Sequence, residues 1–190
     1  MKTAYIIEDE EILRSLLSTF FATTFPDIEL LGMTGDGGEG IEKCLELAPD
    51  LVIVDIQLPE VNGLEILHLL KRKIPKVKIL IFTGKTNPQT VKIAVHGNAD
   101  GFINKISSLN ELEKAIRAVQ RDEQFFSPDI YDEVVRIREE EPKRSRPPFE
   151  QNQIGTLTGN PCLTLLQLLP GSLSCRKDLI TIAIDGLASA

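Results

Sequence analysis

Short apolar runs alternate with segments of helical spacing over the first two thirds of the chain. Five of these runs are rich in β-branched residues and predict strands at Ala4–Ile7, Ile28–Leu31, Leu51–Val54, Val77–Phe82 and Gly101–Ile103. The first, third and fourth runs are almost entirely apolar, as expected of strands that are buried on both faces of a sheet.

Between the strands, apolar residues recur three or four positions apart and predict five helices. Their apolar faces comprise Ile12, Leu16 and Phe20; Ile41, Cys44, Leu45 and Ala48; Leu64, Leu67, Leu70 and Ile74; Val91, Ala94 and Val95; and Leu109, Leu112, Ile116 and Val119. Because strands that alternate with helices form βαβ units, the sequence predicts an α/β fold with a doubly wound parallel sheet and helices on both faces.

The pattern changes after Gln120, and three parts are predicted. Residues 1–122 form the α/β domain. Residues 123–153 comprise a helical extension, which starts near Ser127-Pro128-Asp129, and a charged linker with several prolines. Residues 154–190 are apolar, rich in small residues and irregular, and they read poorly as a domain.

Composition narrows the function classes. The formal net charge of −7 argues against non-specific nucleic-acid binding, which usually needs a basic face. No run approaches the roughly 20 apolar residues that span a bilayer, and the N-terminus lacks the apolar core of a signal peptide. The three cysteines have no metal-ligand spacing, which favours free thiols in a reducing compartment. We therefore expect a cytoplasmic protein without a membrane partner.

Polar residues follow the predicted strands at the edge where ligands gather in an open parallel sheet. Glu8-Asp9 follows the first strand, Asp55 the third, Thr83-Gly84 ends the fourth, and Lys105 follows the fifth. Carboxylates this close repel one another unless a cation lies between them, and an all-oxygen ligand set suits Mg²⁺. The sequence therefore predicts an acidic magnesium site at this edge.

Such a site can make a carboxylate into a phosphoryl acceptor. Asp55 is the predicted nucleophile because its strand is the most buried. Asp9 is expected to hold Mg²⁺ directly and Glu8 through water. Thr83 and Lys105 are expected to bind phosphoryl oxygens, while Gly84 leaves room for the donor.

The motifs in Ile6–Glu10, Leu51–Glu65, Phe82–Gly84 and Gly101–Lys105 resemble the receiver domain of two-component response regulators, in the CheY-like superfamily. The resemblance covers about residues 2–121. It implies a flavodoxin-like five-stranded sheet of order 2-1-3-4-5 and phosphotransfer from a sensor histidine kinase to Asp55.

The same resemblance implies that Mg²⁺ is held by Asp9, Asp55 and the backbone carbonyl of Gln57, and that Thr83 and Phe102 form the switch. It describes a phosphoacceptor rather than an enzyme, with Mg²⁺-dependent self-phosphorylation and autodephosphorylation as its only chemistry. A phosphohydrolase of the haloacid-dehalogenase type would need an aspartate where Gln57 stands.

Two positions depart from the family pattern. Glu8 stands where the family most often has aspartate, and its extra methylene shifts the carboxylate outward. Ile106 stands where many relatives have proline, so a cis peptide after Lys105 is not expected. Neither change removes a reacting group.

The output half is harder to assign. The receiver with its linker resembles regulators of the NarL/LuxR type, which end in a helix-turn-helix and dimerise on DNA. Leu165–Leu179 matches that module only faintly, Pro170 would stop a helix, and no Lys or Arg follows Lys177. A frameshifted or truncated effector, a diverged output segment and a disordered tail all stay open, as does a stand-alone receiver that acts through protein contacts.

Overall fold

In the computed structural model, which describes residues 1–106 and 109–140, the paired strands form one sheet of order β2-β1-β3-β4-β5-β6 in which every pair is parallel. The strands are β1 (Thr3–Ile7), β2 (Glu29–Thr34), β3 (Leu51–Val54), β4 (Lys78–Thr83), β5 (Gly101–Asn104) and β6 (Phe125–Phe126). The predicted α/β class and the predicted order of five strands are confirmed. The short β6 was not predicted.

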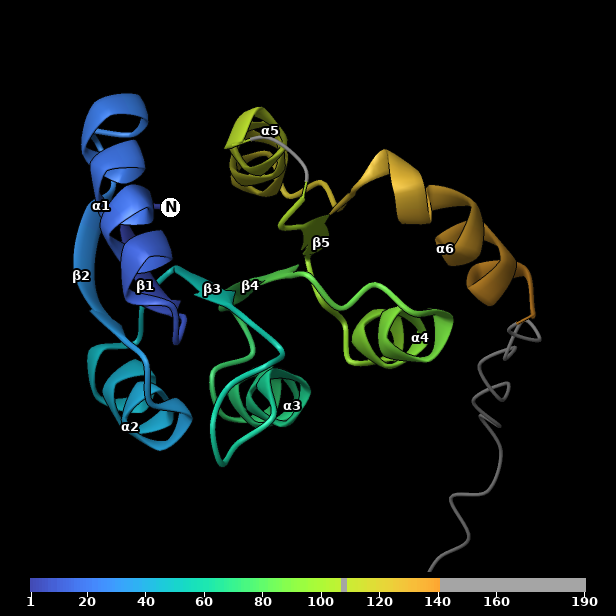
Figure 1. The fold of residues 1–190 in the computed structure, drawn as a ribbon, viewed down its shortest axis with the longest axis horizontal. Coiled ribbons are helices and arrows are strands. Elements are labelled where there is room, and N and C mark those ends of the chain that lie inside the picture. Colours follow the sequence, from blue (N-terminus) through green and yellow to red (C-terminus); the bar gives the residue numbers. More distant parts are fainter. Residues whose placement is uncertain (107–108, 141–190) are drawn as a thin grey trace, which may run out of the picture. The chain divides into compact units, whose positions relative to one another are not determined.

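Helices cover both faces of the sheet (Figure 1). They are α1 (Glu11–Thr24), α2 (Gly37–Leu47), α3 (Gly63–Lys73), α4 (Pro88–His96), α5 (Leu109–Gln120) and α6 (Pro128–Glu140). Helices α1 and α5 lie on one face, and α2, α3 and α4 lie on the other. Alternate residues of β3 enter the two cores, Val52 and Val54 on one side and Leu51 and Ile53 on the other.

The buried face of α1 differs from the predicted one. Ile12 is 86% exposed and Leu16 is 46% exposed, whereas Leu17 and Phe21 are buried against the sheet. The helix contains two apolar stripes of equal spacing, and spacing alone does not tell which stripe faces the core. The prediction that Ile12, Leu16 and Phe20 share the packed face is therefore wrong for its first two members.

The C-terminal end of α2 also needs correction. Leu45 is exposed, and Ala48 lies outside the helix as its C-cap in the left-handed conformation, with φ 45°. The left-handed residue ends the helix, and its amide donates to the carbonyl of Cys44. Cys44 itself is fully buried, as the predicted apolar face requires.

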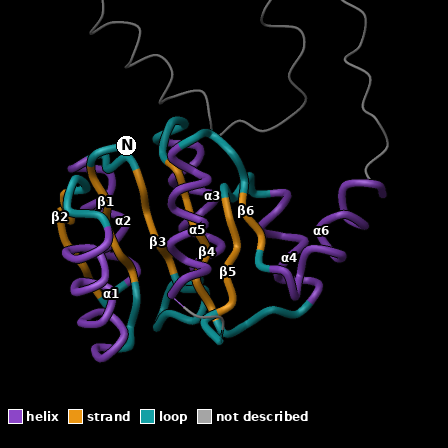
Figure 2. Tube along the Cα trace, turned by 90° about the horizontal axis from the view of Figure 1, so that it is seen from above, coloured by secondary structure: helices purple, strands orange, loops and turns teal. Residues whose placement is uncertain are grey.

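Strand β6 and helix α6 extend the domain beyond α5. β6 pairs with the outer edge of β5, and α6 packs beside α4 (Figure 2). Ile130, Val134 and Ile137 of α6 are buried in the same core cluster as Phe102 of β5. The predicted helical extension is therefore part of the same compact unit as the receiver-like sheet.

The predictions for residues 141–190, which comprise most of the charged linker and the output segment, lie outside the described residues. Among the helices of the described part, none has the length and apolar content that a bilayer crossing requires.

Candidate functional site

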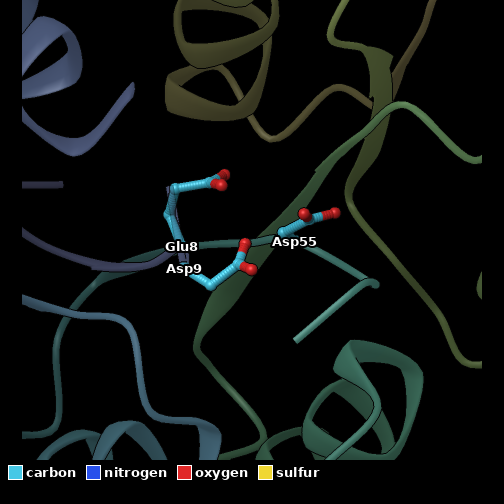
Figure 3. Close-up of side chains that lie close together, drawn as sticks. All are labelled: Glu8, Asp9 and Asp55. Carbon is cyan, nitrogen blue, oxygen red and sulfur yellow. The ribbon is translucent and has the colours of Figure 1, made fainter. Parts of the chain in front are cut away.

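The parallel strands deliver three carboxylates to one end of the sheet. Ile7 of β1 and Val54 of β3 are in register, and the amide of Asp55 donates to the carbonyl of Ile7 at 2.9 Å. Glu8 and Asp9 follow directly on β1. Their carboxylates and that of Asp55 offer ligand atoms that all lie within 4.8 Å of one another (Figure 3).

Lys105 joins this cluster from the end of β5. Its Nζ donates to Oδ2 of Asp55 and to Oε1 of Glu8, each at 2.7 Å, and reaches Oε1 of Glu10 at 3.5 Å. Burial lowers the pKa of Lys105, but the hydrogen bonds to Asp55 and Glu8 outweigh burial and raise it above its ordinary value. Lys105 is therefore a permanent cation within an acidic site.

Glu8 is the most deeply buried of the three carboxylates, with 1% of its surface exposed. Burial raises the pKa of Glu8 to about 7, against the lowering effect of Lys105. Arg14 of α1 holds the backbone on either side, because its guanidinium donates to the carbonyls of Glu8 and Asp9 at 2.6 and 2.7 Å. Asp9, in contrast, is exposed.

Asp55 has one oxygen engaged and one without a partner. The residue is 3% exposed, and Oδ2 accepts from Lys105, whereas Oδ1 is buried without a hydrogen-bond partner in the structure. An orphaned buried oxygen is costly, and a bound ion or reactant is one way of satisfying it. Carboxylate oxygens from Asp9 and Asp55, with Glu8 beside them, are ligands that suit a hard divalent cation such as Mg²⁺. The residues therefore fit the predicted metal.

The remaining predicted residues lie at the end of β4 and in the loop after β3. Thr83, the last residue of β4, is fully buried, its carbonyl accepts from the amide of Lys105 at 3.0 Å, and its hydroxyl accepts from the amide of Lys85 at 3.2 Å. Gly84 follows with open space where a Cβ would be. Gln57 is exposed in the loop after β3. Its role as a carbonyl ligand stays a prediction.

Phe102, the predicted switch aromatic, is fully buried in β5 against α4 and α6. The ring therefore has an inward position in this structure. The peptide bond between Lys105 and Ile106 is trans, as the replacement of proline suggested.

The loop between β3 and α3 depends on Gly63. A Cβ at this position would lie 1.9 Å from the carbonyl oxygen of Asp55, because the amide of Gly63 donates to Ile56 at 3.1 Å and brings the two backbones together. Asn62 begins α3 by accepting from the amide of Leu64 at 2.9 Å. The glycine thus fixes the backbone that carries Asp55.

Sequence reasoning missed three contributors. Arg14 of α1 donates to the carbonyl of Glu8, and Glu10, just before α1, accepts from Lys105. Asn104 precedes Lys105 at the end of β5. Asn104 offered a signal, since it is a polar residue in an otherwise apolar strand. Arg14 offered none, because an arginine on an exposed helix is common.

Comparison with known proteins decides the family. The family model described as the response regulator receiver domain matches residues 4–117. The chain belongs to the response regulator receiver family. Among curated relatives, the receiver is 30% identical over 139 residues to the response regulator protein VraR of Staphylococcus aureus, an alignment that covers 73% of this chain and 65% of VraR. The match thus spans less than two thirds of that relative.

Solved structures agree. A two-component response regulator of the LuxR family from Aurantimonas sp. aligns with the receiver at a TM-score of 0.66 and 28% identity, over 73% of this chain and 98% of that one. A DNA-binding response regulator of the LuxR family from Staphylococcus aureus aligns at a TM-score of 0.59 and 29% identity, over 63% of this chain and 98% of that one. The isolated receiver domain of RcsB from Salmonella enterica, at 20% identity and a TM-score of 0.64, shares the fold over 72% of this chain and 97% of that one.

Proposed function

We propose that this receiver accepts a phosphoryl group on Asp55 from a sensor histidine kinase and passes the signal on as a change of conformation. The observation that carries the proposal is the state of Asp55, which is buried, held by Lys105 through Oδ2, and left with Oδ1 unpartnered beside two further carboxylates. Such an oxygen is fixed in position and available to react.

The chemistry is an in-line displacement at phosphorus. Oδ1 of Asp55 forms the new P–O bond as the P–N bond to the phosphohistidine breaks, and the electron pair of that bond stays with the imidazole, which takes up a proton. The product is an acyl phosphate on Asp55. Lys105 can then turn from Glu8 toward a phosphoryl oxygen, since its Nζ lies at 2.7 Å from both carboxylates.

A magnesium ion held by Asp9, Asp55 and the carbonyl of Gln57, with Glu8 acting through water, would neutralise the carboxylates and the charge that develops on the phosphoryl oxygens. Thr83 would donate its hydroxyl to a phosphoryl oxygen. Because Gly84 leaves open space beside it, a donor can approach from that side.

Thr83 and Phe102 are the proposed switch, and the elements expected to respond are α4, β5 and α5. Phosphorylation adds nearly two negative charges to the pocket and favours the conformation in which Thr83 and Lys105 close on them. The buried ring of Phe102 lies between β5 and the helices α4 and α6, so a shift of β5 reaches both helices.

For the output we propose descent from a DNA-binding transcriptional regulator, because two of the similar proteins are LuxR-family regulators and one is described as DNA-binding. Dimerisation belongs to the same proposal and comes from the resemblance to the NarL/LuxR type. The alternative is a stand-alone receiver that acts through protein contacts. A gel shift on promoter DNA, with and without a phosphodonor, separates the two.

The phosphoacceptor proposal is tested with the full chain, acetyl phosphate and Mg²⁺. Intact mass and peptide mapping should place one phosphoryl group on the peptide that contains Asp55. Asp55→Asn should abolish the adduct, and EDTA should prevent its formation. An adduct that persists in Asp55→Asn, or none in the wild type, overturns the proposal.

A further inference from the structure

Asn104 ties the segment that carries Lys105 to the start of α6. The residue is 9% exposed, and its Nδ2 donates to Oδ2 of Asp129 at 2.8 Å. Its backbone amide donates to the hydroxyl of Ser127 at 3.2 Å, and its side-chain Oδ1 accepts from the backbone amide of Ile106 at 3.0 Å. The side chain of Asn104 therefore joins the first turn of α6 to the residue after Lys105, and its backbone adds a bond to the residue before α6.

These bonds bracket Lys105. Asn104 precedes the lysine, Ile106 follows it, and the amide of Lys105 itself donates to Thr83 at 3.0 Å. The backbone at Lys105 is thus held directly by β4 and, through the neighbouring Asn104, by residues around the start of α6. A side chain that must turn from Glu8 to a phosphoryl oxygen starts from this fixed backbone.

The hydrogen-bond partners of Asn104 are Ser127, just before α6, and Asp129, in its first turn. Ser127 is fully buried, and its amide donates to the carbonyl of Phe102 at 3.0 Å. Asp129 lies in the first turn of α6, where the helix dipole favours a carboxylate. A hydrogen bond to an ionised carboxylate is stronger than one between neutral groups. Behind these residues, α6 is buried through Val134 and Ile137.

We propose that Asn104 is a positioning residue for Lys105 and that the Asn104–Asp129 hydrogen bond couples the phosphorylation site to α6. When Lys105 closes on the phosphoryl group, the end of β5 moves with it, and the hydrogen bond passes that movement to the start of α6. Helix α6 is then the first element of the route to the C-terminal part of the chain. The inference rests on the proposed phosphoacceptor function of Asp55.

The pair allows a swap of donor and acceptor. Asn104→Asp places two carboxylates face to face and breaks the bond. Asp129→Asn keeps it, because the new amide oxygen still accepts. The double variant, Asn104→Asp with Asp129→Asn, restores the bond in the reverse direction, while Oδ1 of residue 104 can still accept from Ile106. Asp132→Ala, which removes a carboxylate from an exposed residue of α6, is the matched control for Asp129→Ala.

The experiment uses the full chain with acetyl phosphate and Mg²⁺. Mass spectrometry reports the adduct on Asp55, and amide chemical shifts of Val134 and Ile137 report the response of α6. We expect Asn104→Asp and Asp129→Ala to reduce the α6 shift change at least twofold, and the rate of phosphorylation to fall severalfold in Asn104→Asp. The double variant should recover both quantities, while Asp129→Asn and Asp132→Ala should resemble the wild type.

A merely structural bond would lower stability without changing the response of α6 to phosphorylation. An adduct on Asp55 with the same α6 shift change in wild type, Asn104→Asp and Asp129→Ala would overturn the inference alone, as would a double variant that recovers nothing. The absence of any adduct in the wild type would overturn the phosphoacceptor proposal and this inference with it.

Discussion

Glu8 is a buried carboxyl group whose protonation is linked to folding. Because its pKa rises from 4.5 to about 7 on folding, the folded chain binds more protons than the unfolded chain between these values. The stabilising contribution is complete below pH 4.5 and is lost as the pH rises through about 7. The full loss amounts to about 3 kcal/mol.

We therefore predict that Glu8→Gln flattens the pH dependence of stability. Denaturant unfolding in EDTA should show the free energy of unfolding of the wild type falling relative to that of Glu8→Gln between pH 5 and pH 8, because the amide cannot titrate. Parallel pH profiles would contradict the prediction.

Gly63 and Gly84 provide a second prediction at the residue scale. Gly63→Ala should lower the free energy of unfolding by about 1–3 kcal/mol, since its Cβ would overlap the backbone of Asp55. Gly84→Ala should change stability by less than about 0.5 kcal/mol, since nothing lies near its Cβ. Urea unfolding of both variants measures the difference, and equal losses would refute it.

Much of the site was predictable at this scale, because the carboxyl ends of parallel strands must meet. That rule alone placed Glu8, Asp55 and Lys105 together, as the structure confirms. The rule could not predict which of the carboxylates accept hydrogen bonds from Lys105. The contact of Lys105 with Glu8 depends on the length of the glutamate side chain and on burial, neither of which is visible in a strand-end pattern.

At the scale of elements, α1 shows where sequence periodicity stops being informative. Ile12 and Leu16 form one stripe of the helix, and Leu13 and Leu17 form another that is offset by one residue. Over these first turns only the second stripe packs on the sheet, and the rotation of the helix about its axis decides which stripe does so. That rotation is a tertiary property, and no local pattern specifies it.

We predict different costs for adjacent leucines of this helix. Leu17→Ala should destabilise the protein by about 2–5 kcal/mol, since Leu17 is fully buried. Leu16→Ala should cost well under about 1 kcal/mol, since the side chain is nearly half exposed and alanine favours the helix. Thermal or urea unfolding distinguishes them, and a larger loss for Leu16→Ala would contradict the observed rotation.

Strand β6 and the packing of helix α6 were also beyond reach for a sequence argument, although the helix itself was predicted. Two residues make too short a run to predict a strand, and the spacing of Ile130, Val134 and Ile137 predicts a helix without saying what it packs against. The structure supplies that partner, since these residues share a core with α4 and Phe102.

For the whole molecule, the packing of α6 sets where the receiver ends. A chain that ends at Glu140 should fold and accept the phosphoryl group on Asp55 as fast as the full chain, because it keeps every residue of the two core clusters found in the described part. A chain that ends at Asp122, the boundary expected from the sequence, should be less stable by several kcal/mol, because it loses Ile130, Val134 and Ile137 and uncovers Phe102. Urea unfolding and phosphorylation rates of the two shortened chains test this, and equal stability would refute it.

The pairing of β6 with β5 has a consequence for the behaviour of the protein in concentrated solution. The backbone amides of Phe125 and Ser127 donate to the carbonyls of Asp100 and Phe102, and the hydroxyl of Ser127 accepts from the backbone amide of Asn104. Strand β5 is therefore paired on both sides, and the sheet ends instead in a strand of only two residues. Without these residues, the apolar strand β5 would present open amides and carbonyls to any extended chain. By pairing with β5, residues 125–127 occupy the backbone groups to which another chain could add as a strand, and they thereby reduce the tendency to aggregate.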